Sequence, residues 1–273
     1  MGEVMKSFIF ILTAVVLGAI FLPALHGQGG NSAPQNTARQ DIPSSPREKD
    51  ELQARIYMAR KDYAQAADLY AKLWREYPKD ASYPNYIGIA LLQEGKLNDA
   101  RKSFEQATKV NKRFPDAYNN LGATYYAEKS YKKAIAQYRR SLGLEPNSAS
   151  IYTNIGYAYF AEKQIPKAME AFHKALELDP QVFDETSRVG SIMSFRSVVD
   201  RGLFNFILAK NYAESGDAAN CIVYLRRAAD EGYKEIGKVR RDPAFAKVIA
   251  DPDVKALLDE VAPEPPPPHA PHT

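Results

Sequence analysis

A 34-residue pattern that recurs without a gap is the feature that most constrains the fold of this chain. It is clearest where the stretch from Asp116 to Pro146 aligns with the stretch from Ser150 to Pro180. The positions that keep the same residue type include the pairs Tyr118 and Tyr152, Asn120 and Asn154, Gly122 and Gly156, Tyr125 and Tyr159, Ala134 and Ala168, Leu142 and Leu176, and Pro146 and Pro180. Each stretch contains two apolar runs of helical period, separated by a polar turn and closed by proline. The pattern therefore predicts a repeated helix–turn–helix hairpin.

Small and large residues alternate at fixed places in each hairpin. We expect the small residues to mark close approach of the two helices, with Gly122 facing Ala134 and Gly156 facing Ala168. Large residues should fill the space beside them as a layered core. They are Tyr125, Tyr131 and Tyr138 in one hairpin and Tyr159, Ile165 and Phe172 in the next.

The same spacing extends in both directions along the chain. Four units run from residue 47 to 182, with boundaries at 47–80, 81–114, 115–148 and 149–182, and Lys112 stands where proline is expected. A degenerate fifth unit spans 202–235, with Cys221 at the usual alanine position. The period and the small/large alternation resemble the tetratricopeptide repeat. That resemblance implies an all-α fold, a right-handed α-solenoid of helix–turn–helix repeats with C-terminal capping helices.

The N-terminal segment has the features of an export signal. Residues 8–22 are an apolar run that follows Lys6, and small residues follow the run. We expect residues 1–27 to be a signal peptide, with a possible start at Met5 and cleavage near Gln28. The alternative is an uncleaved membrane anchor, although the run is shorter than the roughly 20 residues that a spanning helix needs. The mature chain would then be periplasmic or secreted.

The remaining segments connect or close the array. Residues 28–46 are polar and rich in Gly, Pro and Ser, which predicts a disordered linker, and residues 263–273 form a proline-rich disordered tail. An insert at 183–201 could be extended or helical, and Asp200 is expected to N-cap the helix after it. Residues 236–262 should cap the array with two short helices, Ala244 to Ile249 and Val254 to Val261, each preceded by an Asp-Pro pair.

The sequence offers little chemistry for catalysis. The four histidines lack partners at metal-ligand spacing, and His173 is expected to be solvated. The single cysteine, Cys221, permits no intramolecular disulfide and has no partner that would activate it. We therefore expect neither a catalytic site, nor a metal, nor a cofactor. Lys and Arg are interleaved with Asp and Glu at a net charge of +3, so we expect no nucleic-acid binding.

Binding of a protein is the function that the resemblance implies. In repeats of this family the first helix of each unit lines a concave groove that holds a peptide or a partner helix. Mapped onto this chain, the groove would contain Glu51, Arg55, Met58, Asn85, Ile89, Leu92, Asn119, Ala123, Tyr126, Thr153, Tyr157 and Phe160. Asn119 would hydrogen-bond an extended partner backbone. Alternatively, Tyr126, Tyr157 and Phe160 pack against neighbouring helices or beneath the insert.

The sequence leaves two function classes open. The favoured one is a non-catalytic scaffold for an envelope or secreted protein. The alternative is a subunit that presents substrates to an enzyme, or regulates one, such as a glycosyltransferase or protease. Groove clamps for a terminal carboxylate place several cations beside asparagine, because the carboxylate requires charge-assisted donors. Arg55 is alone in this groove, which argues against such a clamp.

Overall fold

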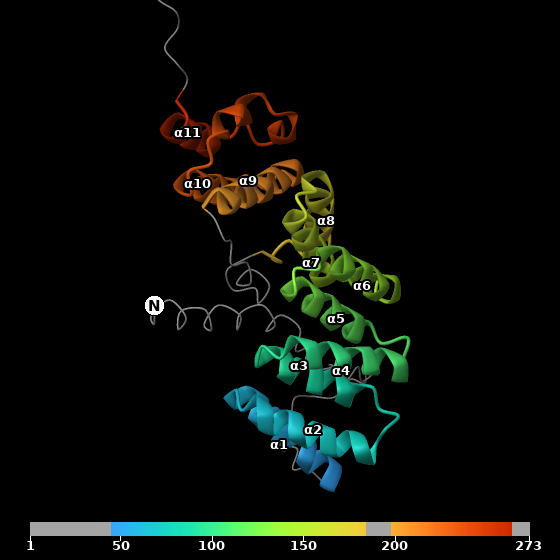
Figure 1. Cartoon of the computed structure of the whole chain (residues 1–273). Coiled ribbons are helices and arrows are strands. Elements are labelled where there is room, and N and C mark those ends of the chain that lie inside the picture. Colours follow the sequence, from blue (N-terminus) through green and yellow to red (C-terminus); the bar gives the residue numbers. More distant parts are fainter. Residues whose placement is uncertain (1–44, 184–197, 264–273) are drawn as a thin grey trace, which may run out of the picture.

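The computed structural model describes residues 45–183 and 198–263, and within these ranges it is all-helical, without a strand. The first eight helices form four consecutive hairpins (Figure 1). They are α1 (Pro46–Arg60), α2 (Tyr63–Glu76), α3 (Ser82–Gln93), α4 (Leu97–Val110), α5 (Pro115–Ala127), α6 (Tyr131–Leu144), α7 (Ala149–Ala161) and α8 (Ile165–Leu178). The predicted α-solenoid is confirmed. In Figure 1 the first helices α3 and α5 lie to the left of their partners α4 and α6.

Each hairpin turns through the same backbone geometry. In the turn after each first helix one residue is in the left-handed region, with φ between 58° and 75°: Lys61, Gly95, Lys129 and Lys163. The amide of this residue and the amide after it bond back to the last turn of the helix, as Lys129 N–H does to Tyr126 O at 2.8 Å and Ser130 N–H to Tyr125 O at 2.8 Å. This pairing satisfies carbonyls that a helix end otherwise leaves without a donor. The repeated turn fixes the angle at which the second helix returns along the first.

The recurring glycine of the first helices has a steric basis. A Cβ atom added to Gly122 would lie 2.5 Å from the ring of Tyr138, and one added to Gly156 would lie 2.4 Å from the ring of Phe172. The ring of the second helix therefore lies directly on the glycine of the first. This is the predicted arrangement in which a large residue of each second helix, Tyr138 or Phe172, fills the space beside the small residue of the first helix.

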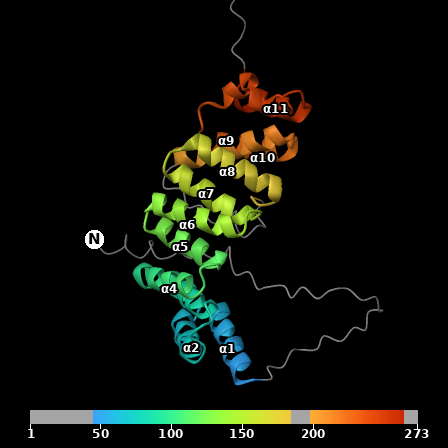
Figure 2. The ribbon, with the colours of Figure 1, turned by 90° about the vertical axis from the view of Figure 1, so that its right-hand side faces the viewer.

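The C-terminal part continues the stack (Figure 2). Helices α9 (Val198–Ser215) and α10 (Ala218–Asp230) form a fifth hairpin, followed by the 3-10 segments η3 (Ile236–Arg241) and η4 (Pro243–Phe245) and by α11 (Pro252–Val261). Asp200 lies inside α9, so its predicted role as N-cap was wrong; the apolar residues before it extend the helix toward the N-terminus. The predicted helix from Ala244 to Ile249 is instead the short η4 and a turn, in which Phe245 and Val248 are buried.

The ends of the described chain are well capped. Ser45 and Glu48 form a reciprocal capping box at the start of α1, so the last predicted linker residues belong to the first helix. Asp251 caps α11 by accepting from the amides of Asp253 and Val254. The predicted leader, most of the linker, most of the insert and most of the tail lie outside the described residues. Among the helices in the described ranges, none is long and apolar enough to cross a membrane.

Candidate protein-binding surfaces

Asparagines connect the first helices of successive units. Asn120 donates from Nδ2 to Oδ1 of Asn85 at 3.0 Å, and Asn154 donates in the same way to Asn119 at 3.0 Å. Asn85 and Asn119 are only 3% and 7% exposed. These hydrogen bonds therefore connect successive first helices. The predicted hydrogen bonding of Asn119 to a partner backbone was wrong, because its side chain is nearly buried and its oxygen already accepts from Asn154 of the next unit.

The predicted groove residues of α7 are part of the core. Phe204 of α9 lies with its ring centroid 5.7 Å from that of Tyr157 and 5.8 Å from that of Phe160. Both residues are less than 9% exposed, and burial raises the pKa of Tyr157. Thr153 is fully buried and donates its hydroxyl to the carbonyl of Ala149. The alternative that Tyr157 and Phe160 pack against a neighbouring helix is thus what the structure shows.

Two further predicted groove residues, Ile89 and Leu92 of α3, are also buried. They pack in one cluster with Phe104 and Leu121, which links the second and third units. Glu51 is occupied as well, because it accepts hydrogen bonds from Arg47 at 2.9 Å and from the hydroxyl of Tyr83 at 2.5 Å. Ile89 and Leu92 were therefore wrongly assigned to partner contact, whereas Glu51 is bonded within the array and keeps part of its surface.

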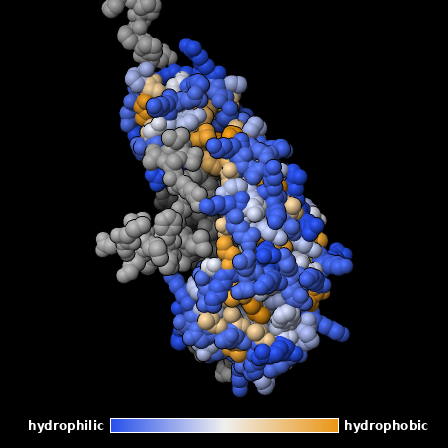
Figure 3. Space-filling model, in the orientation of Figure 1, coloured by the Kyte–Doolittle hydropathy of each residue, from blue (hydrophilic) through white to orange (hydrophobic). Residues whose placement is uncertain are grey.

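Besides Glu51, four of the predicted groove residues keep accessible surface. Arg55 is exposed, while Met58, Ala123 and Tyr126 are half-buried. Met58 packs against the clusters of the first and second units, and the ring of Tyr126 lies 5.3 Å from that of Tyr131. Burial raises the pKa of Tyr126 to about 12. We call Arg55, Met58 and Tyr126 the inner-face residues. Figure 3 shows apolar residues interspersed with hydrophilic ones over one side of the array.

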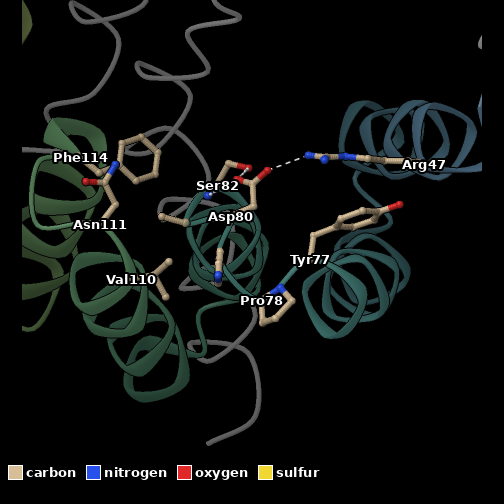
Figure 4. A pocket seen from close by; sticks show the side chains of 10 residues that line it. Arg47, Tyr77, Pro78, Asp80, Ser82, Val110, Asn111 and Phe114 are labelled. Atoms are coloured by element: carbon tan, nitrogen blue, oxygen red, sulfur yellow. Dashed lines mark hydrogen bonds and ion pairs between the residues drawn. The ribbon is translucent and has the colours of Figure 1, made fainter.

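A cavity of about 840 Å³ lies at the loops between hairpins, and none of the predicted groove residues lines it (Figure 4). We call it the corner cavity. Phe114 and Asn111 lie on one side of it and Tyr77 and Pro78 on the other, with Asp80 and Ser82 between them. Its lining residues are Arg47, Tyr77, Pro78, Lys79, Asp80, Ala81, Ser82, Val110, Asn111 and Phe114. The only sequence signal for it was Lys112, at the position where the other units have proline.

The titratable groups of the described region form no arrangement typical of catalysis. Burial raises the pKa of the Cys221 thiol to about 12, so the nucleophilic thiolate is suppressed. His173 is half-exposed and lies between Glu177 and Glu214, with nitrogen–oxygen distances of 3.4 and 3.9 Å. Within residues 45–183 and 198–263, no group of three His, Cys, Asp or Glu side chains is placed to hold a metal ion.

Several proteins of known name share sequence with this array. The heat-shock protein cognate (HSC) co-chaperone sgt12 of Aspergillus fumigatus is 27% identical over 128 residues, which cover 47% of this chain and 38% of the relative. The photosystem I assembly protein Ycf3 of Rippkaea orientalis is 31% identical over 104 residues, covering 32% of this chain and 60% of the relative. The chain thus spans less than two thirds of either relative.

Solved structures and family models were also compared with the chain. MamA from Desulfovibrio magneticus superposes with a TM-score of 0.48 at 20% identity, covering 73% of this chain and 98% of that structure. Models of the tetratricopeptide repeat match residues 52–80, 86–149 and 149–182. These ranges span the hairpins from α1 to α8. The first four hairpins of this chain are tetratricopeptide repeats.

Proposed function

We propose that this chain is a non-catalytic scaffold that binds a peptide segment or helix of another protein. The observation that carries the proposal is the uninterrupted array of tetratricopeptide repeats, since arrays of this family serve as protein-interaction scaffolds. The names of the relatives, a co-chaperone and an assembly protein, agree with such a role.

The inner face of the first three units is the surface that we propose for this partner. Arg55, Met58 and Tyr126 retain accessible surface there, whereas α7 is covered by α9 through Phe204. The surface combines one cation, a flexible thioether and an aromatic ring, and such residues often anchor interfaces. Because it carries little charge, we expect binding to depend weakly on salt.

Site-specific photo-crosslinking tests this assignment. A photoreactive phenylalanine analogue replaces Tyr126 in one variant and Lys132, an exposed residue of α6, in the control. We expect a defined crosslinked partner from position 126 and none from position 132. The same partner is then titrated against the Met58→Ala and Tyr126→Ala variants. Equal crosslinking at both positions, or unchanged affinity of both alanine variants, would contradict the inner-face assignment.

We further propose that the chain is exported and meets its partner in the periplasm or outside the cell. The apolar run at residues 8–22, preceded by Lys6, supports export. Mass spectrometry of the protein from its native host should find a mature N-terminus near Gln28. A full-length chain in the membrane fraction would favour the anchor, and a full-length chain in the soluble cytoplasmic fraction would contradict export.

A further inference from the structure

We propose that the corner cavity is a second binding site, which takes an acidic segment of a partner protein that also carries a large apolar side chain. The apolar side chain would enter between Pro78 and Phe114. Carboxylates beside it would pair with Lys79, Lys112 and Arg113. This site is separate from the inner-face residues, so either assignment can fail without the other.

The walls of the cavity provide the apolar part of the site. Tyr77 and Pro78 come from the loop that joins α2 to α3, and Val110 and Phe114 come from the end of α4 and the start of α5 (Figure 4). Pro78 is exposed, and the other three are half-buried. The cavity therefore presents an apolar surface to solvent on two facing sides, with a polar floor between them. An apolar side chain of a partner would lose most of its contact with water there.

The single carboxylate of the lining is already neutralised. Asp80 accepts at Oδ2 from Arg47 at 2.7 Å, and at Oδ1 from the amide and hydroxyl of Ser82 at 3.0 and 2.6 Å. The guanidinium of Arg47 lies 4.4 Å from the ring centroid of Tyr77, which holds it against the wall. Asp80, Ser82 and Arg47 thus form a connected polar floor, in which Arg47 is shared between Asp80 and Glu51.

The cations at the rim are unpaired. Lys79 lines the cavity, and the turn that contributes Asn111 and Phe114 carries Lys112 and Arg113 between them. All three side chains are exposed, and none forms an ion pair with another described residue. Asp116, two residues after Phe114, does not line the cavity; burial and then the nearby Glu145 raise its pKa. Lys79 in the lining and Lys112 and Arg113 on the adjoining turn therefore place three unpaired positive charges at this corner.

This charge is specific to one corner of the array. At the position where the first two units have Lys79 and Arg113, the third and fourth have Asn147 and Gln181. One residue earlier, Lys112 replaces the proline found at Pro78, Pro146 and Pro180. Two positions before Arg113 the second unit has Asn111, whereas the later units have Glu145 and Asp179. The repeat pattern does not require these substitutions, so they indicate a function of this corner.

The surroundings favour a peptide over other anionic ligands. The cavity is open to solvent, whereas sites for small molecules enclose most of their ligand. A nucleic-acid strand would need cations along a continuous track. Here 36 Lys and Arg are balanced by 33 Asp and Glu, and they are interleaved along the chain. A short acidic segment with one apolar anchor matches a cluster of three cations beside a small apolar cleft.

A defined peptide tests the proposal. The probe is the fluorescein-labelled peptide Asp-Glu-Trp-Glu-Asp, titrated by anisotropy against the protein up to millimolar concentration. One variant replaces Lys79, Lys112 and Arg113 with Ser. Its control replaces three other exposed and unpaired lysines, Lys132, Lys234 and Lys255, and so has the same net charge. We expect the corner variant to bind about tenfold more weakly than the control, from three exposed ion pairs of modest strength each.

Three further comparisons test the apolar anchor, the separation from the inner-face residues and a nucleic-acid ligand. The peptide with Ser in place of Trp should bind much more weakly, and the Tyr126→Ala variant should bind the original peptide like the unmodified protein. Circular dichroism confirms that all variants are folded. Absence of saturable binding, or equal affinity of the corner variant and the control variant, overturns the site. Binding of a short oligothymidylate through the same three cations, without peptide binding, also overturns it and indicates a nucleic-acid ligand.

Discussion

At the residue scale, three of the hairpins depend on one absent atom, the Cβ of a glycine in the first helix. Gly88, Gly122 and Gly156 each lie under an aromatic ring of the second helix, at Phe104, Tyr138 and Phe172. The rings are at most 2% exposed, so they have no room to move away from a new side chain. The glycine lowers the helix propensity of α3, α5 and α7, and the close aromatic packing offsets that loss.

Replacing Gly122 with Ala should therefore destabilise the protein. The new Cβ would lie 2.5 Å from the Tyr138 ring, and overpacking of this kind typically lowers the free energy of unfolding by about 1–3 kcal/mol. The matched control is Gly143→Ala in α6, where a Cβ would meet no atom within 4 Å; it should raise stability by up to about 1 kcal/mol. Urea denaturation followed by circular dichroism measures both. Equal stability of the two variants would show that the hairpin can separate to admit a Cβ.

Asp242 is a second residue whose environment has a measurable consequence. Burial opposes ionisation, but hydrogen bonds from Lys210 at 2.8 Å and from the amide of Ala244 at 3.0 Å outweigh it and lower the pKa of Asp242 below its usual value of 3.8. A carboxyl whose pKa is lower in the folded state stabilises the fold above its unfolded pKa. That stabilisation is lost as the pH falls through the folded pKa.

Asp242→Asn should accordingly reduce stability by about 1 kcal/mol at neutral pH, because it removes the ion pair and weakens the cap. The difference from the unmodified protein should shrink as the pH is lowered below about 4, where Asp242 itself becomes protonated. Urea denaturation at neutral and acidic pH measures the two differences. If the difference in free energy of unfolding between the two proteins stays constant across this pH range, the charge of Asp242 does not contribute to stability.

At the element scale, the four regular hairpins were predictable from period and turn chemistry, since the apolar residues and the turns recur every 34 residues. The start of α9 and the 3-10 segments were not. They follow from packing between distant residues, such as the ring of Phe206 lying 5.9 Å from that of Phe245, and a single sequence does not show such pairs. The groove assignment failed for the same reason: Phe204 covers the α7 residues, and it lies beyond the insert.

Phe204→Ala should separate the fifth hairpin from the first four. The ring of Phe204 lies within 6 Å of the rings of Tyr157, Phe160 and Phe172, so its removal leaves a cavity between α7, α8 and α9, at a loss of about 3–5 kcal/mol. Trp74, the single tryptophan, lies in α2 and reports on the first unit, while circular dichroism reports on the whole chain. In urea, the circular dichroism transition of the variant should begin before the fluorescence transition.

The control for this experiment is Val223→Ala on α10. Val223 is 43% exposed, and its truncation should change stability by about 0.5 kcal/mol or less. Its two transitions should remain as close together as in the unmodified protein. If the transitions of the Phe204→Ala variant also coincide, the junction through Phe204 does not couple the fifth hairpin to the rest.

At the scale of the whole molecule, each hairpin contacts chiefly its neighbours. A loss of stability in one unit should therefore affect the adjacent units most and distant units least. The C-terminal end is closed by α11, whose Val254, Leu257 and Leu258 are at most 2% exposed. Two ion pairs, Arg226–Glu260 and Arg240–Asp259, lie at the edge of this contact and are too exposed to contribute much. Apolar burial therefore holds the cap in place.

Truncation of the cap tests how far that stabilisation extends. A chain that ends at Ala250 lacks α11 and exposes the apolar residues of α10 that α11 covers, with a loss of about 1.5–3 kcal/mol for each buried aliphatic side chain removed. Hydrogen exchange should then accelerate strongly in α10, less in α9, and little in α3 and α4, since the effect must cross each interface in turn. A chain that ends at Pro263 keeps α11 and should exchange like the full chain. Equal acceleration in α3 and α10 would show instead that the five hairpins unfold as one cooperative unit, in which no part of the array can open while the rest holds a partner.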